Sequence, residues 1–455
     1  MPTLSNLWTK MFSIRKKYTY VGPGHDYPKP PFGKNVRVDL EHSYAFGYEC
    51  CHAFNMLKAI RKAGYDACIA GGCVRDMVMG KSFHDVDIAT NMPPEMLKKV
   101  FGEIKSNNGE AHGTVLVPFE GFMYEVTLFR ADGTYSDGRH PDFVEWAETF
   151  EEDSRRRDFT INAMGIDCEG NVLDYHGGID DLFNKIIRTV GNPEDRFNED
   201  PLRIIRAFRF ASVLGFEIDN DTLSAASKVS PKLVNIHAER IHDELSKVIY
   251  APTEGKGFAR FVKWIAEYVD ESVIKKFFGM SAKNLLTVSN DIQTGIEQKE
   301  GSWNTYIAYM MLFRNLDNFK AVMTDLKCTR DEIGYVQFYR HMIDFRESHP
   351  NIQENIVEWV DLVSDKHCLD ATICYQMLHE GRPPVALPMY DFLSEADNPT
   401  HYNTRKCSEF LTTLGKYSGK EYGVALHKIR KAMYLHKLNS VYEFSDTDAK
   451  IALDE

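Results

Sequence analysis

The chain has 455 residues, of which 43% are hydrophobic and 26% are charged, and this composition excludes a wholly disordered protein. Its length suits roughly two to four domains. No apolar run approaches the roughly 20 residues of a membrane-spanning helix, and the net charge of −12 argues against a general nucleic-acid binder, which is usually basic.

Residues 1–47 are predicted to form an N-terminal extension. Glycine and proline crowd residues 22–33, which excludes a regular helix or a central strand there. A secretory signal is not expected, because the continuous apolar stretch of such a signal is missing. The early basic residues, Arg15 to Lys17, keep a cleaved organellar presequence as the alternative to a flexible extension, and we expect a cytoplasmic protein.

The nine cysteines are scattered along the chain, and no C-x-x-C pair occurs. This pattern predicts free thiols in a reducing compartment, with neither a disulfide framework nor a zinc site.

Residues 48–193 are predicted to form a mixed α/β domain. A helical pattern begins near His52, and a short buried strand then ends in Gly71-Gly72. Alternating or continuous apolar patterns predict strands at residues 67–70, 86–88, 115–117 and 124–129.

The first chemical motif combines this glycine turn with Arg75 and an Asp85-x-Asp87 pair. Glycines let backbone amides approach a phosphate closely, and a guanidinium adds a charged fork. Two aspartates at i and i+2 on a strand point to one face, where their charges repel unless a cation such as Mg²⁺ lies between them. Each half of this motif is weak evidence alone, but their order within one strand–turn–helix–strand unit is strong evidence.

Two further segments add charged groups. Glu125 lies in an apolar strand, either as a third acid at the metal site or on the exposed face of an edge strand. Arg155-Arg156-Arg157-Asp158 places three guanidiniums together, which suits a triphosphate, and Asp158 could accept hydrogen bonds from ribose hydroxyls. The alternative is a solvated basic turn, although the apolar residues that follow favour a half-buried position.

The fourth motif is Glu199-Asp200-Pro201-x-Arg203, with Pro201 expected in the first turn of a helix. Asp200 and Arg203 are then i and i+3 on one helix face. A carboxylate beside a guanidinium complements the base edges of cytosine and adenine but not those of guanine and uracil. The alternative is that Asp200 only caps the helix.

Residues 194–455 are predicted to be mostly helical, because apolar residues recur there at helical spacing, as in Ile241, Leu245 and Val248. Charge is unevenly distributed in this half. Residues 351–400 carry nine acids against two basic residues, whereas residues 401–440 carry eight basic residues against two acids. The basic segment is expected on a helix and is either an RNA-binding element or a solvated face.

These motifs, taken in order, closely resemble those of the class II tRNA nucleotidyltransferases, the CCA-adding enzymes, and their relatives the bacterial poly(A) polymerases. The resemblance covers about residues 65–250 and includes three further segments. They are Asp174–Gly178, Ile187-Arg188 and Glu239–Leu245. His242-Asp243 also matches the start of a metal-phosphohydrolase motif, a match attributed to chance because no partner histidine cluster accompanies it.

The resemblance implies a seahorse-like fold: an α/β nucleotidyltransferase head with a small mixed sheet and flanking helices, followed by a mostly α-helical neck, body and tail. The corresponding ranges are residues 1–47 for the extension, 48–193 for the head, 194–255 for the neck, 256–350 for the body and 351–455 for an RNA-binding tail.

It also implies the site residues. Asp85, Asp87 and Glu125 are the implied catalytic residues, with two Mg²⁺ ions bound by Asp85 and Asp87. The implied nucleotide-binding residues are Gly72, Arg75, Arg157, Asp158, Asp200, Arg203, Arg206 and Arg209. The implied supporting residues are Gly71, Asp76, Glu199 and Arg240.

The implied function is template-independent addition of CCA to tRNA 3′ ends from CTP and ATP, with release of pyrophosphate. Residues 130–141 resemble the flexible loop that CC-adding specialists are expected to lack, which disfavours such a specialist. Poly(A) polymerases of this family tend to have a very basic C-terminus, whereas this C-terminal half is acidic overall. Poly(A) polymerase remains the alternative, and a non-catalytic RNA binder is disfavoured because the three acids are present.

Overall fold

The computed structural model describes most of the chain up to residue 348 and the C-terminal helices. The described ranges are 19–21, 36–38, 48–81, 83, 85–106, 113–132, 144–253, 255–298, 305–348, 404–414, 416–439 and 445–453. Two compact units divide the chain, residues 1–236 with 268–270 and residues 237–267 with 271–455. The predicted boundaries at 47, 193, 255 and 350 are finer than this division and stay a prediction.

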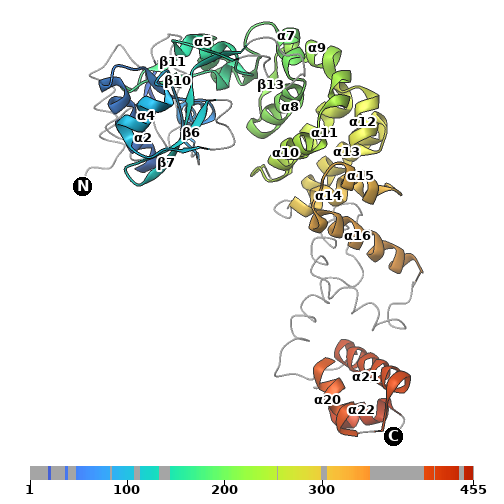
Figure 1. Cartoon of the computed structure of the whole chain (residues 1–455). Coiled ribbons are helices and arrows are strands. Elements are labelled where there is room, and N and C mark those ends of the chain that lie inside the picture. The colour runs from blue at the N-terminus through green and yellow to red at the C-terminus, as the bar shows by residue number, and fades with distance from the viewer. Residues whose placement is uncertain are drawn as a thin grey trace, which may run out of the picture. The chain divides into compact units, whose positions relative to one another are not determined.

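The first unit is built on a seven-stranded sheet of order β11-β10-β3-β4-β7-β6-β5 (Figure 1). β4 and β7 run parallel, and the other neighbouring pairs of this sheet are antiparallel. The predicted small mixed sheet is therefore confirmed. Its strands are β3 (Ala67–Ala70), β4 (Asp87–Thr90), β5 (Lys105–Ser106), β6 (Thr114–Phe119), β7 (Phe122–Leu128), β10 (Gly165–Ile166) and β11 (Val172–Leu173).

Helices flank this sheet and continue beyond it in the same unit. They are α2 (Tyr48–Lys62), α3 (Gly72–Val78), α4 (Pro94–Phe101), α5 (Phe150–Arg155), α6 (Gly178–Asn184), α7 (Pro193–Glu199), α8 (Leu202–Leu214) and α9 (Asn220–Val229), with 3₁₀ turns η3 (Thr160–Asn162) and η4 (Ser230–Asn235). Helix α2 is an example of why these helices form. Its buried residues recur at helical spacing, so they make one apolar face, and α2 packs against β3. Helix α8 begins at Leu202, with Pro201 as its N-cap residue rather than inside the first turn.

Three short strand pairs complete this unit. β8 (Arg130–Asp132) pairs with β9 (Val144–Trp146), and β12 (Ile186–Ile187) pairs with β13 (Glu217–Ile218). In the N-terminal extension, β1 (Thr19–Val21) pairs with β2 (Val36–Val38). The Arg37 guanidinium donates to the Glu169 carbonyl at 2.9 and 2.7 Å. The extension therefore makes contacts that a flexible segment would not make, and the Gly/Pro-rich stretch between its strands lies outside the described residues.

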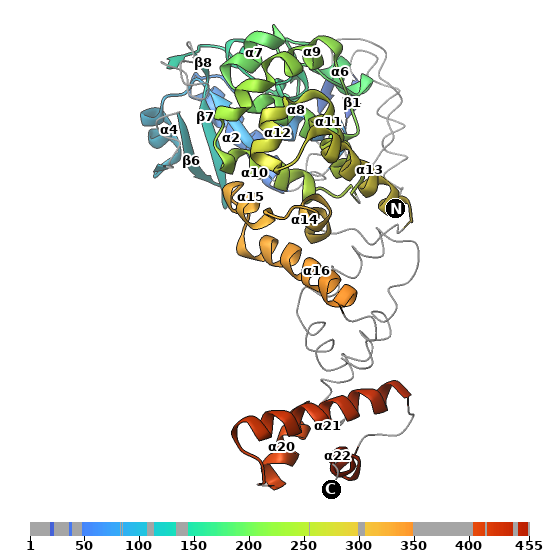
Figure 2. The same ribbon diagram turned by 90° about the vertical axis from the view of Figure 1, so that its right-hand side faces the viewer.

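The second unit is helical in all its described elements, which confirms the helical prediction for them (Figure 2). α14 is its most apolar helix, because every side chain from Ile307 to Phe313 is buried. Its helices are α10 (Ala238–Ile249), α11 (Lys256–Tyr268), α12 (Glu271–Phe278), α13 (Ala282–Gln298), α14 (Thr305–Phe313), α15 (Phe319–Asp325), α16 (Arg330–Ser348), α20 (Thr404–Leu414), α21 (Gly419–Asn439) and α22 (Asp446–Ala452).

The C-terminal helices α20, α21 and α22 pack on one another. α21 confirms the helix predicted for the basic segment. The acidic stretch 351–400 lies outside the described residues. Among the helices that the structure describes, none combines the length and the apolar character needed to cross a membrane.

Gly178, the first residue of α6, is required by close packing. A Cβ there would lie 2.2 Å from the Thr160 carbonyl oxygen, so backbone would have to move. We expect Gly178→Ala to lower the free energy of unfolding by at least about 2 kcal/mol. The matched control is Gly423→Ala on α21, where a Cβ meets nothing within 4 Å and stability should hold or rise slightly in urea unfolding. Equal effects of the two changes would contradict this account of α6.

Candidate active site

Pairing of β4 with β7 places two of the predicted acids side by side. Asp87 and Glu125 are register partners in this parallel pair, although 38 positions separate them in sequence. Both side chains are exposed, while their neighbours Ile88 and Val126 are buried, as alternation along a strand requires. Asp85 is exposed and lies two residues before β4, which begins at Asp87. The strand is therefore shorter than predicted, since the prediction placed both aspartates on it.

The electrostatics of Asp87 reflect this crowding of carboxylates. Desolvation by the surrounding protein raises the pKa of Asp87, and the charges of Glu125 and Asp85 raise it further. The Arg157 guanidinium opposes these effects. Oxygen ligands with repelling charges are the donor set that a hard divalent cation stabilises.

The glycine turn lies against the same groups. Gly71 has φ +88°, a conformation that favours glycine. A Cβ at Gly71 would lie 3.3 Å from Arg157 Nη1 and 3.9 Å from Asp87 Oδ2. Any other residue at position 71 would therefore be strained and would crowd the Arg157 guanidinium, which explains the glycine there. Gly72 follows as the first residue of α3.

Arg75 is hydrogen-bonded within the protein. Its Nε and Nη2 donate to the Asp76 carboxylate at 2.9 and 2.8 Å, and its Nη1 donates to Asn162 Oδ1 at 2.8 Å. The residue is only 9% exposed, so these bonds fix its guanidinium between α3 and η3. Its predicted contact with a triphosphate stays a prediction.

Asp153, on α5, is a central residue that the sequence analysis missed. Its side chain is completely buried, with Oδ1 accepting from Arg156 Nε and Nη2 and Oδ2 accepting from Arg157 Nε and Nη2 at distances of 2.7–3.3 Å. Burial alone would raise the pKa of Asp153, but the charges of Arg157 and Arg156 outweigh it and lower the pKa. Its i+3 and i+4 spacing to these arginines is the sequence signal that could have found it.

Asp158 forms the second buried carboxylate–arginine contact. Its Oδ2 accepts from Arg206 Nε and Nη2 at 2.9 and 2.6 Å, and its Oδ1 accepts from the Phe159 amide at 2.8 Å. Burial would raise its pKa, yet Arg206, with the charge of Arg203, holds the pKa of Asp158 at about 2. This ion pair ties α8 to the segment that follows α5.

Arg203 pairs with Glu199, the last residue of α7. Arg203 Nη1 lies 2.5 Å from Glu199 Oε2, which also accepts from Arg196 Nη1 at 2.8 Å. Arg203 Nη2 donates to the Arg156 carbonyl at 3.2 Å. Asp200 Oδ1 accepts from the Leu202 amide at 3.1 Å, at the start of α8, and its predicted part in base reading stays a prediction.

The remaining predicted residues fall in two places. The Arg209 guanidinium lies on α8 over the Phe210 ring at 3.8 Å. Arg240 lies on α10 in the second unit, so its predicted support of the site stays a prediction. The predicted flexible loop lies largely outside the described residues.

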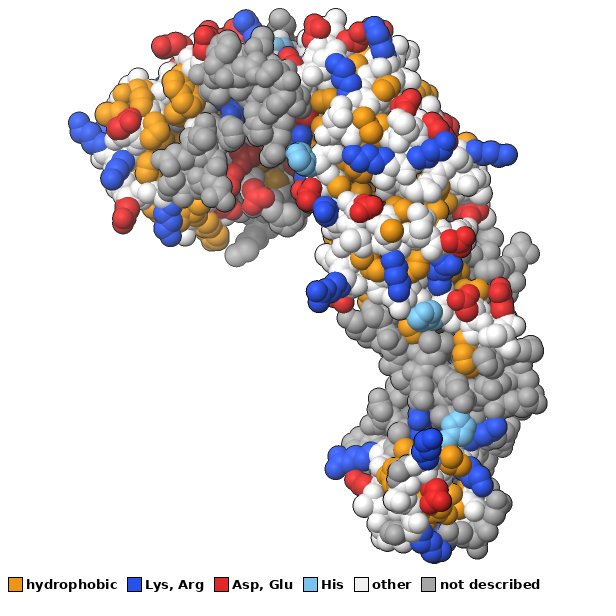
Figure 3. Space-filling view, turned by 45° about the vertical axis from the view of Figure 1, so that its right-hand side comes forward, with side chains coloured by type: hydrophobic (Ala, Val, Ile, Leu, Met, Phe, Trp, Pro, Cys, Tyr) orange, Lys and Arg blue, Asp and Glu red, His pale blue; other side chains and the backbone are white. Residues whose placement is uncertain are grey.

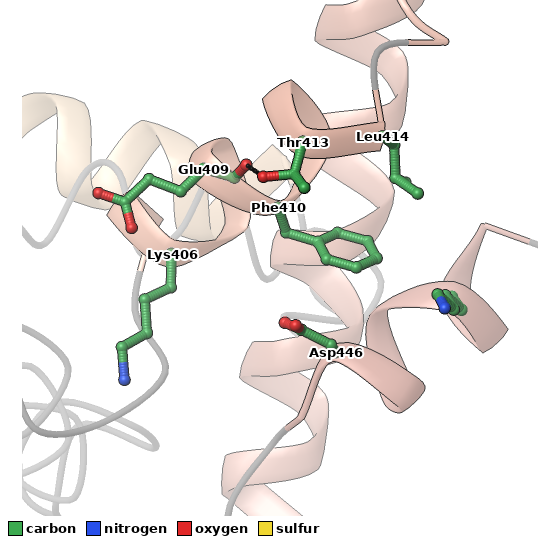
Figure 4. Close-up of a pocket in the computed structure, with 7 residues that line it drawn as sticks. Lys406, Glu409, Phe410, Thr413, Leu414 and Asp446 are labelled. Atoms are coloured by element: carbon green, nitrogen blue, oxygen red, sulfur yellow. Dashed lines mark hydrogen bonds between the residues drawn. The ribbon is translucent and has the colours of Figure 1, made fainter.

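The C-terminal helices carry a pocket of about 510 Å³ (Figure 4). Its lining includes two lysines and two acids, so its charges balance and give it no special attraction for phosphate. The lining residues are Lys406, Glu409, Phe410, Thr413, Leu414, Asp446 and Lys450. We assign this pocket no function.

The site residues of the first unit define a class of protein, the polymerase-type nucleotidyltransferases. The family model of the poly A polymerase head domain matches residues 67–188. A second model, described as a probable RNA and SrmB-binding site of polymerase A, matches residues 215–263.

Curated relatives narrow this class. The CCA-adding enzyme of Streptococcus pyogenes is 32% identical over 392 residues, 85% of this chain and 93% of that enzyme. The CCA-adding enzyme of Lactobacillus helveticus is also 32% identical, over 85% of this chain and 94% of the relative. The chain belongs to the family of CCA-adding enzymes. The CCA-adding enzyme of Ligilactobacillus salivarius is 46% identical over the matched residues. The chain spans only about half the length of this relative and of three similar ones, 51–52%.

Solved structures agree on the fold. The Bacillus stearothermophilus CCA-adding enzyme in complex with CTP is 25% identical, with a TM-score of 0.63 over 85% of this chain and 93% of that one. The Thermotoga maritima CCA-adding enzyme complexed with tRNA is 20% identical, with a TM-score of 0.65 over 91% and 98% of the two chains. The second likeness shows the fold alone.

Asp153 offers a direct test of the buried contacts. Asp153→Asn removes the anion that Arg156 and Arg157 share, and we expect the free energy of unfolding to fall by about 3 kcal/mol. The control is Glu151→Gln on the same helix, whose partner Arg155 is exposed and whose loss should cost no more than about 0.5 kcal/mol. Urea unfolding of both variants measures these losses. Equal losses of unfolding free energy would contradict the account.

Proposed function

We propose that this chain adds C, C and A to the 3′ end of tRNA, using CTP and ATP and releasing pyrophosphate without a template. The observation that carries the proposal is the parallel pairing that puts Asp87 beside Glu125, next to the Gly71 turn and Arg157. Kinship with CCA-adding enzymes over 85% of the chain supports the choice of product.

We also propose that Asp85 and Asp87 hold two Mg²⁺ ions, with Glu125 in support. The fit rests on the donor set, since all three are carboxylates and their mutual charges raise the pKa of Asp87. Bound there, the ions would favour ionisation of the RNA 3′-hydroxyl and neutralise charge on the departing pyrophosphate.

The arginines of the site have a positioning role in this proposal. Asp153 holds Arg157 beside Gly71, where its guanidinium faces the anionic side of the site. The nucleotide's phosphates would lie between Arg157 and the carboxylates of β4 and β7. The RNA 3′-oxygen then bonds to the α-phosphorus while the bond to pyrophosphate breaks, and the hydroxyl proton passes to solvent.

Base selection is assigned to Asp200 and Arg203. Glu199 fixes the Arg203 guanidinium, whose side chain is 12% exposed, and Asp200 precedes it by three residues. An Arg–Asp pair complements the amino group and adjacent ring nitrogen of cytosine or adenine, whereas guanine and uracil would leave polar groups unpaired.

The C-terminal helices are proposed to bind tRNA. Figure 3 shows Lys and Arg side chains over these helices, at the C-terminal end of the chain. Arg405, Lys416, Lys420 and Lys428 are exposed there. Such local positive charge suits the RNA backbone even in a chain of net charge −12. We place the activity in the cytoplasm, with which the free cysteines of the described residues are consistent.

The activity is tested by incubating the full chain with Mg²⁺ and a tRNA that ends before CCA, with CTP, ATP or both. We expect exactly three nucleotides to be added, after which addition stops. Asp85→Ala should abolish incorporation, because the carboxylate proposed to hold the metal is gone. The control is Asp243→Ala, which removes an exposed acid of the second unit and should leave incorporation unchanged. Long A tails would support poly(A) polymerase instead, and no incorporation by the unmodified chain would overturn both activities.

The specificity proposal has its own test. Arg203→Ala should relax the choice of nucleotide, raising GMP and UMP incorporation relative to CMP by about tenfold or more, since one polar contact pair is worth roughly 1–3 kcal/mol. Arg196→Ala, which removes the other partner of Glu199, is the matched control and should preserve the preference for C and A. An unchanged preference in Arg203→Ala would refute the base-reading role.

A further inference from the structure

A cluster of metal-ligating side chains lies in the second unit. Among the residues that the structure describes, His242, Cys328 and Glu332 bring a ring nitrogen, a thiol and a carboxylate oxygen within 4.8 Å of one another. His242 lies on α10, Cys328 in the turn between α15 and α16, and Glu332 in the first turn of α16. Glu332 is buried, and the other two are half-buried.

Two of the three groups already have the spacing of ligands. His242 Nε2 lies 3.3 Å from Glu332 Oε2. Two ligands at about 2.1 Å from a tetrahedral zinc ion are separated by about 3.4 Å, so the separation of this pair already fits one shared ion. The Cys328 sulfur needs a shift on the order of 1 Å to complete the set, because zinc–sulfur bonds are longer, about 2.3 Å.

The local backbone holds these groups in place. The Thr329 amide donates to Glu332 Oε2 at 2.6 Å, and the Glu332 amide donates to Thr329 Oγ1 at 3.2 Å. Lys327, directly before Cys328, has φ +68°, an uncommon conformation for a residue with a side chain. The fully buried Tyr309 hydroxyl hydrogen-bonds His242 Nε2 at 3.1 Å, and an ion on Nε2 would replace this bond.

We propose that His242, Cys328 and Glu332 bind one Zn²⁺ ion, which ties α10 to the start of α16. Imidazole, thiolate and carboxylate together form a ligand set that zinc accepts and that magnesium and calcium do not favour. Binding replaces the thiol proton with the ion and releases that proton to solvent. The proposal departs from the prediction of no zinc site, which rested on the lack of C-x-x-C pairs. Asp243 is exposed and is not a member of the cluster.

The proposal is tested on the full chain, freed of metal with a chelator and then titrated with Co²⁺ and Zn²⁺. With Mg²⁺ in excess to occupy the carboxylates of the candidate active site, we expect one Zn²⁺ per chain by mass spectrometry, a thiolate-to-cobalt absorption band, and a Tm that rises with Zn²⁺. Cys328→Ser should abolish the absorption band and weaken Zn²⁺ binding more than about 100-fold, since even removal of a group that only orients a ligand costs 10–100-fold.

Two controls make the result decisive. Cys51→Ser changes a half-buried thiol on α2 in the other unit and should leave the band and the affinity unchanged. His242→Gln removes the imidazole ligand and keeps the Cys328 thiol. It should weaken Zn²⁺ binding as Cys328→Ser does. The proposal is overturned if the unmodified chain binds less than one ion, or if Cys328→Ser and Cys51→Ser retain the same band and affinity.

Discussion

Arginine cannot lose its charge inside a protein, so each guanidinium buried in the first unit requires an anion beside it. Asp153 and Asp158 meet this requirement at the centre of the site. Asp153 pairs with both Arg156 and Arg157, and Asp158 pairs with Arg206. These contacts hold Arg157 beside the Gly71 turn and tie α8 to the segment that follows α5.

The same contacts join the sheet to the helices that follow it. Arg206 reaches from α8 to Asp158, and Arg203 reaches from α8 to the Arg156 carbonyl. A third arginine, Arg196 on α7, donates to the Arg155 carbonyl at 2.7 Å. The arginines proposed to bind phosphate and the arginine proposed to set base choice are therefore joined by one set of hydrogen bonds.

Local chemistry made part of this site predictable. The Gly71 turn, Asp87 and Glu125 each followed from residue type and pattern, and the structure places Asp87 beside Glu125. The parallel pairing that joins them could not be predicted, because register between distant strands is set by tertiary packing. The fold of the helical half followed from apolar spacing for the same local reason.

Side-chain partners were the part of the site that the sequence did not predict. Glu199 pairs with the Arg203 guanidinium from one turn away at i−4, a contact that the i, i+3 spacing of Asp200 and Arg203 does not indicate. Asp153 was missed because a single acid before three arginines looks like an ordinary helix residue until its burial is known. The cluster of His242, Cys328 and Glu332 was invisible in sequence, since the fold alone brings it together.

The central claim is that buried carboxylates hold the arginines of the site in place. A double-mutant cycle of Asp158→Asn and Arg206→Gln, measured as free energy of unfolding in urea, tests it most directly. The account predicts a coupling energy of about 2 kcal/mol, because the ion pair is buried and doubly hydrogen-bonded. Costs that add to within about 0.5 kcal/mol would show independent residues and would contradict it.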